Sequence, residues 1–429
     1  MNFRKVKYIL PLFSVLLFAG CEAEIEEFKP DAGDIDLTTF VTIGNSLTAG
    51  FSDNALYRSG QINSVANILA GQLMHAGLQE FNQPLMKDEF GFGGRLMLGV
   101  VNDNLLPVPM PGEVDPANFA NIYADAGPFH NMGVPGARTN HLLAPGYGSD
   151  QGNPYFARFA SSPATTIMDD VLALDPTFFS LWIGSNDILG YALNGGEDLP
   201  ITTPEEYETL LSLVLSGLTA DGAKGAIGNI VDIASIPFFN VIPYNALFLT
   251  DPAIVAALNE AYEMAPHVSF SMGPNPFVVI DEAIQPFGFR QLEAGEKVLL
   301  TAMTGITELN WGSQVFMPAE YYLSNAQLGE IAVAVDAYNT IIENVASQFG
   351  LAYVDIRTLM QQAKSGIYFD AIEFSTTFVT GGTFSLDGVH LSARGNATVA
   401  NEFIRAINRT YNASIPKAHP GEFDGIIFP

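Results

Sequence analysis

Apolar positions along the chain alternate between short β-type runs and longer runs with helical spacing. Dense apolar and β-branched residues predict strands over residues 38–44 (TTFVTIG), 177–184 (TFFSLWIG), 228–236 (GNIVDIASI) and 351–356 (LAYVDI). Apolar residues recurring every three or four positions predict helices over residues 61–77, 162–174, 203–219, 325–350 and 392–411. Strands that alternate with helices in this way predict a parallel sheet covered by helices on both faces.

Two segments interrupt this alternation, at about residues 78–130 and 260–325, and both are rich in Pro, Gly and Phe. We interpret them as loop or lid insertions in one α/β domain over residues 38–429, and not as a second domain. Within the later insertion, residues 275–302 are compatible with a small β-hairpin.

The N-terminus has the three-part layout of a secretory signal. Basic residues precede an apolar run over residues 8–19, which is too short to span a bilayer, and small residues follow before Cys21. Cys21 is the only cysteine, and "FAGC" resembles a bacterial lipobox with Phe18 where leucine is usual. We predict that residues 1–20 are a lipoprotein signal peptide and that Cys21 carries the lipid. The alternative is a plain signal peptide with Cys21 as an unmodified thiol.

The predicted anchor places the exported protein in the bacterial cell envelope, at the outer membrane. Seven of the fifteen residues that follow Cys21 are acidic, so we expect residues 21–37 to be an extended, solvated tether.

The whole chain has 18 basic and 46 acidic side chains and a formal charge of −28. This charge disfavours nucleic acid as a partner, since nucleic-acid binding depends on neutralising phosphates. A hydrophobic content of 48% indicates a folded chain.

Polar residues that could carry chemistry follow the predicted strands. Ser46 follows the first strand, and the sequence GSND at residues 184–187 follows the second. The turn at residues 131–139 (NMGVPGART) contains two glycines, and the loop before the last helix supplies Asp387 and His390. Ligands of open parallel sheets bind beyond the carboxyl ends of the strands. We therefore expect these groups to meet at one edge of the sheet.

These residue types match the needs of nucleophilic catalysis at an acyl carbon. A serine such as Ser46 reacts only when a base takes its proton, and the base must be held by an acceptor. Asp387 and His390 are close enough in the chain to project from one loop. The N–H groups of Ser46 and Gly136 and the side-chain amide of Asn186 are suitable donors to an oxyanion.

Four blocks, GNSLTAG, NMGVPGA, GSND and DGVH, occur in the order and context of the GDSL, or SGNH, hydrolase family, which the chain resembles from about Phe40 to Ile407. The resemblance implies a flavodoxin-like three-layer α/β/α fold with a central parallel sheet and no cofactor. It also implies that Ser46 is the nucleophile and that Asp387 orients the base His390. Gly136 and Asn186 correspond to the family residues that complete the oxyanion hole with the N–H of Ser46.

One position departs from the family pattern, because Asn45 stands where the first block usually has aspartate. Asparagine has nearly the same shape, so a role in holding the turn would survive, whereas a role that needs the negative charge would not. We expect activity to survive, since His390 has a separate partner in Asp387.

Each block also has an ordinary structural interpretation. Ser46 alone could be a turn serine, and Asp387 and His390 could form a structural pair. Asn186 and Asp187 could cap a helix, which is the preferred interpretation for Asp187. The choice of Gly136 over Gly133 rests on the family alignment alone.

Other chemistries find no support in the sequence. The remaining histidines lack metal-ligand spacing, and the sequence GFGGR at residues 91–95 lacks the lysine and the serine or threonine of a phosphate loop. No G-x-S-x-G elbow is present, which argues against the α/β-hydrolase fold.

The sequence therefore predicts a serine esterase that cleaves carboxylic esters, with a lipid or other small ester as substrate and the membrane contacted through the N-terminal anchor. A carbohydrate O-deacetylase of the same fold is the nearest alternative. A non-catalytic, surface-tethered binding lipoprotein is the alternative from another class.

Overall fold

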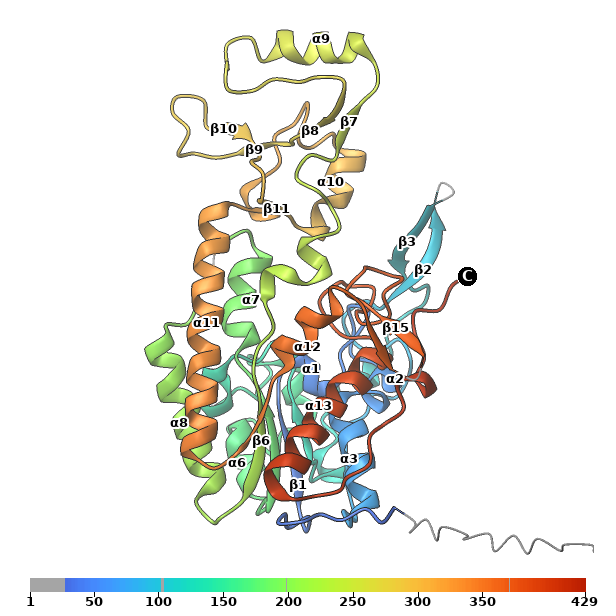
Figure 1. Cartoon of the computed structure of the whole chain (residues 1–429), viewed down its shortest axis with the longest axis vertical. Coiled ribbons are helices and arrows are strands. Elements are labelled where there is room, and N and C mark those ends of the chain that lie inside the picture. The colour runs from blue at the N-terminus through green and yellow to red at the C-terminus, as the bar shows by residue number, and fades with distance from the viewer. Residues whose placement is uncertain (1–27, 102–103, 198, 370) are drawn as a thin grey trace, which may run out of the picture.

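A five-stranded parallel sheet forms the centre of the computed structural model, which describes residues 28–101, 104–197, 199–369 and 371–429 (Figure 1). Its strands are β1 (Phe40–Gly44), β4 (Asn131–Gly133), β5 (Phe178–Trp182), β6 (Lys224–Gly228) and β13 (Ala352–Val354). They lie in the order β13-β6-β5-β1-β4, and every neighbouring pair is parallel. Numbered along the chain, this is the flavodoxin-like order 2-1-3-4-5. The predicted fold class is confirmed.

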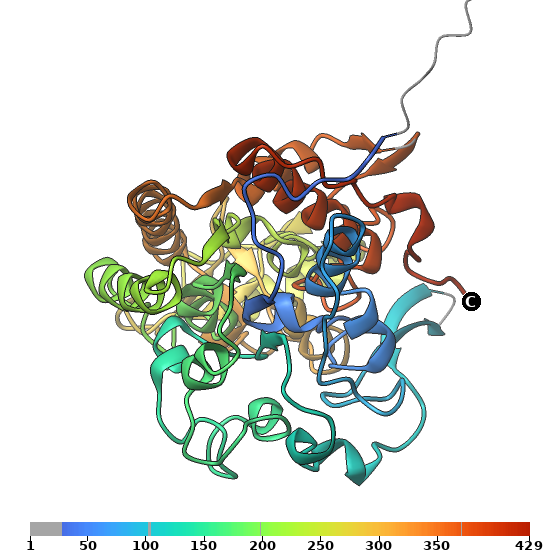
Figure 2. The same ribbon diagram turned by 90° about the horizontal axis from the view of Figure 1, so that it is seen from below.

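Helices cover both faces of the sheet (Figures 1 and 2). One layer contains α6 (Ile167–Leu172), α8 (Pro204–Thr219) and α11 (Asn325–Gln348), and the other contains α3 (Val65–His75) and α13 (Ala393–Tyr411). The termini of the longer helices follow capping rules: Ser324 and Gln327 form a capping box at α11, and Thr203 caps α8 with proline in the first helical position. Within the described ranges, none of the helices is long and apolar enough to cross a membrane.

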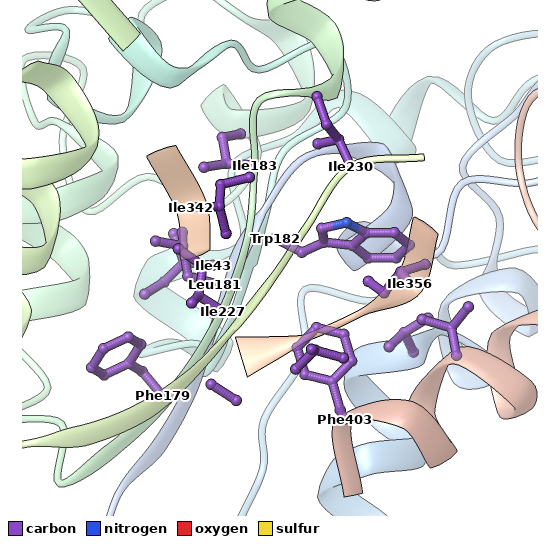
Figure 3. Close-up of a cluster of buried hydrophobic side chains, with 14 of the residues drawn as sticks. Ile43, Phe179, Leu181, Trp182, Ile183, Ile227, Ile230, Ile342, Ile356 and Phe403 are labelled. Carbon is purple, nitrogen blue, oxygen red and sulfur yellow. The ribbon is translucent and has the colours of Figure 1, made fainter. Parts of the chain in front are cut away.

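The sheet buries alternate residues of its strands on opposite faces. Phe179 and Leu181 of β5 lie on the side of Ile342 from α11 (Figure 3). Trp182 points to the other face, where its ring centroid lies 6.2 Å from that of Phe403 in α13. This alternation is the two-residue period of a strand buried on both faces.

One predicted strand is wrong in position. The structure places β6 at Lys224–Gly228, and residues 229–236 form a loop with a short 3₁₀ turn at Ile233–Ser235. The apolar residues Ile230, Ile233 and Ile236 are buried as predicted, but they pack from a loop. The true strand escapes a propensity-based prediction because it is built from small residues. A Cβ on Gly225 would lie 2.5 Å from the ring of Phe179, so close packing requires glycine there.

The remaining elements lie in the connections between these layers. The helices are α1 (Ser46–Ala49), α2 (Arg58–Ile62), α4 (Tyr123–Ala126), α5 (Pro154–Ala157), α7 (Ser185–Leu193), α9 (Pro252–Ala261), α10 (Met303–Glu308) and α12 (Ile356–Ala363). The strands outside the central sheet form antiparallel pairs: β2 (Leu96–Val101) with β3 (Asn104–Pro109), β7 (Leu247–Leu249) with β8 (Gly273–Asn275), β9 (Val278–Ile280) with β10 (Phe289–Gln291), β11 (Lys297–Val298) with β12 (Tyr322–Leu323), and β14 (Ile367–Phe369) with β15 (Ile372–Phe374).

Residues 241–323 form a small structure of their own at one end of the molecule, beside α7 and the start of α11 (Figure 1). Two apolar clusters hold it together, one around Val279 and Met317 and the other around Leu258 and Tyr262. Because β9 and β10 pair in antiparallel fashion, the hairpin suggested for residues 275–302 is confirmed. The division of the chain into the predicted domains stays a prediction.

Residues 28–37, the described part of the predicted tether, are attached to the folded body and are not solvated along their whole length. Ile35 and Leu37 are buried in the main core. The N–H of Asp34 donates to the carbonyl of Tyr411 at 2.8 Å, and the N–H of Ser414 donates to the carbonyl of Asp31 at 2.8 Å. The acidic residues of this segment are exposed, and the two backbone hydrogen bonds hold the segment beside the end of α13. The predicted signal peptide and Cys21 lie outside the described residues.

Candidate active site

Three adjacent strands deliver the candidate residues to one edge of the sheet. Ser46 follows β1 and Asn186 follows β5, and these two strands pair in register from Phe40↔Phe178 to Gly44↔Trp182. Gly136 follows β4, which pairs with β1 on its other side. The strand order reverses at β1, and the carboxyl end of such a switch point is where open α/β sheets bind ligands.

Ser46, His390 and Asp387 form a continuous hydrogen-bonded chain. The Nε2 atom of His390 lies 2.8 Å from Oγ of Ser46, and its Nδ1 atom lies 2.9 Å from Oδ2 of Asp387. Ser46 is 8% exposed, and the ring of Phe51 packs on the imidazole at a centroid distance of 4.7 Å. This arrangement gives a serine hydroxyl a base and gives the base an acceptor that selects its tautomer.

The carboxylate of Asp387 is held by hydrogen bonds on both oxygens. Oδ1 accepts from the N–H groups of Val389 and His390, at 2.9 and 2.8 Å. Oδ2 accepts from the N–H of Asn54 at 2.9 Å, in addition to the imidazole. Burial alone would raise the pKa of Asp387, but the imidazole and these donors outweigh burial and hold that pKa well below its ordinary value. Asp387 therefore stays ionised throughout the neutral range.

Asn45 holds the turn that presents Ser46. Its side-chain oxygen accepts from the N–H of Leu47 at 3.0 Å, which caps the short helix α1. The residue is 1% exposed. The preceding Gly44 allows a close approach, because a Cβ there would lie 2.5 Å from the carbonyl oxygen of Trp182. The neutral amide thus provides the capping acceptor of this turn without a negative charge.

The structure distinguishes Gly136 from Gly133, which the residues alone could not. Gly133 is buried, and its N–H donates to the side chain of Asn131 at 3.0 Å. Gly136 is exposed in a left-handed conformation with φ of +80°. Within the described part of the chain its N–H has no hydrogen-bond partner, and the same holds for the N–H of Ser46. Both N–H groups are therefore available to a ligand.

Asn186 lies in the first turn of α7, beside the turn that carries Gly136. Its amide nitrogen donates to the carbonyl of Ala137 at 2.9 Å, which uses one amide hydrogen and leaves the second for a ligand. The cap interpretation of Asn186 and Asp187 is wrong, because the N-cap of α7 is Gly184 with φ of +111°. A Cβ at this glycine would lie 2.7 Å from the hydroxyl of Tyr207.

Asp187 instead joins α7 to the glycine turn. Its Oδ2 atom accepts from both the N–H and the hydroxyl of Thr139, at 2.9 and 3.0 Å, and its Oδ1 atom accepts from the hydroxyl of Thr202 at 2.9 Å. Burial raises the pKa of Asp187, and these hydrogen bonds oppose the rise. The two segments that carry Gly136 and Asn186 are thus connected by a buried side chain.

Three residues beside the triad were not predicted from the sequence. They are Phe51, whose ring packs on the imidazole, Asn54, whose N–H donates to Asp387, and Asp53, which lies between these two residues in the sequence. The only sequence signal was the pair Asp53–Asn54, three residues after the first block ends at Gly50, since these residue types favour tight turns. In the described ranges, no three or more His, Cys, Asp or Glu side chains are arranged to hold a metal ion.

Comparisons with known proteins show which family the chain matches. The family model of the GDSL-like lipases and acylhydrolases matches residues 40–403. No curated protein matches the chain. A Parabacteroides merdae protein described as a GDSL-like lipase is 13% identical and aligns with a TM-score of 0.37, over 88% of this chain and 99% of its own.

Two further solved structures are similar at the same level. LAE5, an alpha/beta hydrolase enzyme from the metagenome of Lake Arreo in Spain, is 13% identical with a TM-score of 0.38, over 86% of this chain and 95% of its own. Axe2, an acetylxylan esterase from Geobacillus stearothermophilus, is 14% identical with a TM-score of 0.36, over 89% of this chain and 96% of its own.

Proposed function

The chain belongs to the GDSL-like lipase/acylhydrolase family of serine hydrolases, and from this premise we propose that Ser46, His390 and Asp387 are its catalytic triad. The observation that supports this proposal is the unbroken hydrogen-bond chain, with distances of 2.8 Å from Ser46 to His390 and 2.9 Å from His390 to Asp387. The proposed substrate is a carboxylic ester, either a lipid ester or another acyl ester.

In the first half-reaction, Oγ of Ser46 attacks the acyl carbon while Nε2 of His390 takes the hydroxyl proton. The resulting imidazolium keeps its Nδ1–H on Asp387, whose ionised carboxylate stabilises the positive charge. The tetrahedral intermediate then collapses, the ester C–O bond breaks, and His390 gives the proton to the leaving alcohol. The product of this half-reaction is an acyl-enzyme on Ser46.

In the second half-reaction, water replaces the alcohol. His390 takes a proton from the water molecule, the hydroxide attacks the acyl carbon, and the carboxylic acid leaves as Ser46 regains its proton from His390. The N–H groups of Ser46 and Gly136 and the amide of Asn186 stabilise the oxyanion in both half-reactions.

Replacing Asn186 by alanine is expected to lower kcat on the order of 10²- to 10³-fold, since one donor to the oxyanion is lost. KM should change little, because the donor acts on charge that develops only in the transition state. Steady-state kinetics on a p-nitrophenyl ester measures both constants. Asn186→Asp is the matched variant, and its loss should be at least as large, since an acceptor replaces the donor. Retention of kcat within threefold in Asn186→Ala would remove this residue from the oxyanion hole.

The acyl specificity is tested by a series of p-nitrophenyl esters from acetate to palmitate, run beside the Ser46→Ala variant. The aromatic side chains that continue from the triad, Phe51, Tyr155 and Phe92, favour an apolar acyl group, so we expect kcat/KM to rise from acetate to medium chain lengths. A maximum at acetate, together with release of acetate from acetylated oligosaccharides, would instead identify a carbohydrate O-deacetylase. Absence of Ser46-dependent turnover and of labelling by a fluorophosphonate would leave a non-catalytic binding protein.

We further propose that lipid on Cys21 anchors the protein to the bacterial envelope. The proposal is supported by the signal-like residues 1–20 and by the single cysteine at their end. Cys21→Ala should move the protein from the membrane fraction to the soluble fraction and abolish labelling by a clickable fatty acid, while activity on a water-soluble ester is unchanged. Unaltered fractionation of the variant would contradict the anchor.

A further inference from the structure

The turn at residues 52–54, between α1 and α2, is hydrogen-bonded along its length to the loop that carries Asp387. The hydroxyl of Ser52 donates to the carbonyl of Leu391 at 3.1 Å. The N–H of Asp53 donates to the hydroxyl of Ser385 at 3.0 Å, and the next N–H, that of Asn54, donates to Oδ2 of Asp387 at 2.9 Å. The turn thus reaches the same carboxylate oxygen that accepts from His390.

The carboxylate of Asp53 adds a hydrogen bond in which the loop that carries Asp387 is the donor and the turn is the acceptor. Its Oδ1 atom accepts from the N–H of Leu386 at 3.0 Å, and its Oδ2 atom accepts from the hydroxyl of Tyr57 at 2.8 Å. The guanidinium of Arg95 lies 3.6 Å from the centre of the Tyr57 ring and fixes that ring from outside. Asp53 therefore connects the backbone of Leu386, which directly precedes Asp387, to the hydroxyl of Tyr57.

The backbone of this turn is unusual in a way that matches the contact. Asp53 and Asn54 both have left-handed conformations, with φ of +49° and +64°. Aspartate and asparagine tolerate this region better than most residues, but two in succession are strained and persist only when their surroundings hold them. The left-handed turn is what directs the N–H of Asn54 at Asp387.

We propose that Asp53 is a positioning residue for the triad. Its carboxylate locks the strained turn onto Leu386, so that the N–H of Asn54 stays on Asp387 and Asp387 stays aligned with His390. This inference rests on the proposed function, because the group that is positioned is the proposed triad. Burial raises the pKa of Asp53, and the nearby charge of Asp387 adds to the rise while Leu386, Tyr57 and Arg95 oppose it.

Three variants of the full-length protein separate this role from a general effect on folding. Asp53→Gly removes the carboxylate but keeps the freedom to adopt positive φ. Asp53→Asn keeps an oxygen that can accept from Leu386 and also keeps tolerance of the left-handed region. Asp175→Gly is the matched control, because it makes the same substitution at an exposed aspartate that also has positive φ (+50°), at the end of β5 opposite to Asn186.

We expect Asp53→Gly to lower kcat roughly 10- to 100-fold, the size of effect that small misalignments of catalytic groups produce. KM should stay within about twofold, and the rate at which a fluorophosphonate labels Ser46 should fall in parallel with kcat. Asp53→Asn and the control Asp175→Gly should retain most of the wild-type rate. The melting temperature of each variant is measured by thermal unfolding. A melting temperature far above the assay temperature shows that the variant is folded in the assay.

A proton NMR signal gives a measurement that needs no turnover. The Nδ1 proton of His390 in its hydrogen bond to Asp387 should give a downfield resonance, which we expect to broaden or move upfield in Asp53→Gly and to persist in Asp53→Asn. The inference is overturned if Asp53→Gly keeps kcat, labelling rate and this resonance, or if Asp53→Asn loses as much as Asp53→Gly. If wild type shows no Ser46-dependent turnover, the proposed function fails, whereas a resonance that still depends on Asp53 supports the positioning role by itself.

Discussion

Ser46→Ala is expected to lower kcat on p-nitrophenyl esters by on the order of 10⁴-fold or more, because no acyl-enzyme can form without the hydroxyl. The cavity left by one oxygen atom is small, and Asn45 still caps α1 through the N–H of Leu47. The variant should therefore fold and bind substrate. Residual hydrolysis would come from the oxyanion donors alone. Burst-phase kinetics and steady-state rates on the same ester measure the loss.

Labelling distinguishes loss of the nucleophile from loss of the fold. A fluorophosphonate should label wild type at Ser46 and leave Ser46→Ala unlabelled, and peptide mapping identifies the modified residue. Ser149→Ala is a suitable control, because that hydroxyl only donates to the carbonyl of Gly146 in a surface turn. Wild-type turnover by Ser46→Ala would show that another residue carries out the chemistry.

Asp387→Asn is expected to lower kcat on the order of 10⁴-fold by stabilising the wrong tautomer of His390. Two backbone N–H groups donate to Oδ1, whereas only one, that of Asn54, donates to Oδ2, so an amide nitrogen displaces fewer backbone donors at the Oδ2 position. The new amide group is therefore expected to replace Oδ2 and to donate to Nδ1 of His390. The imidazole would then carry its proton on Nε2 and could not accept the proton of Ser46.

The pH dependence of this variant tests the tautomer explanation. Because strongly alkaline solution supplies hydroxide as a base, part of the lost rate should return as pH rises, whereas an unfolded variant would recover nothing. The control Asp125→Asn changes an exposed carboxylate of α4 and should keep the wild-type rate at every pH. A kcat within tenfold of wild type in Asp387→Asn would contradict the assigned role of the carboxylate.

Much of the fold could be predicted because its signals are local. The apolar runs of β1 and β5 and the capped, amphipathic sequences of α8, α11 and α13 each contain their own signal. Strands β4 and β6 carry no such signal. Residues 131–133 are too few to show a period, and residues 224–228 are strand because they fit between β5 and β13, where Phe179 leaves room only for glycine at position 225.

The candidate site divides in the same way. Ser46 could be named from its place after β1, and Asp387 and His390 from their residue types in the block before α13. Asn54 could not, since its role belongs to a backbone N–H that meets Asp387 across 333 residues of sequence. Nor could Asp53, whose partners Leu386 and Tyr57 are brought together only by folding.

The candidates for nucleophile, base, orienter and oxyanion donor could be named before the structure was known, because residue types and the order of the blocks are read directly from the chain. Which of these groups are free to act depends on how the chain folds. Gly133 and Gly136 have the same chemistry, yet the N–H of Gly133 is already bound to Asn131 and that of Gly136 is open. A hydrogen bond depends on the position of its partner in space, and the strand order β5-β1-β4 sets those positions.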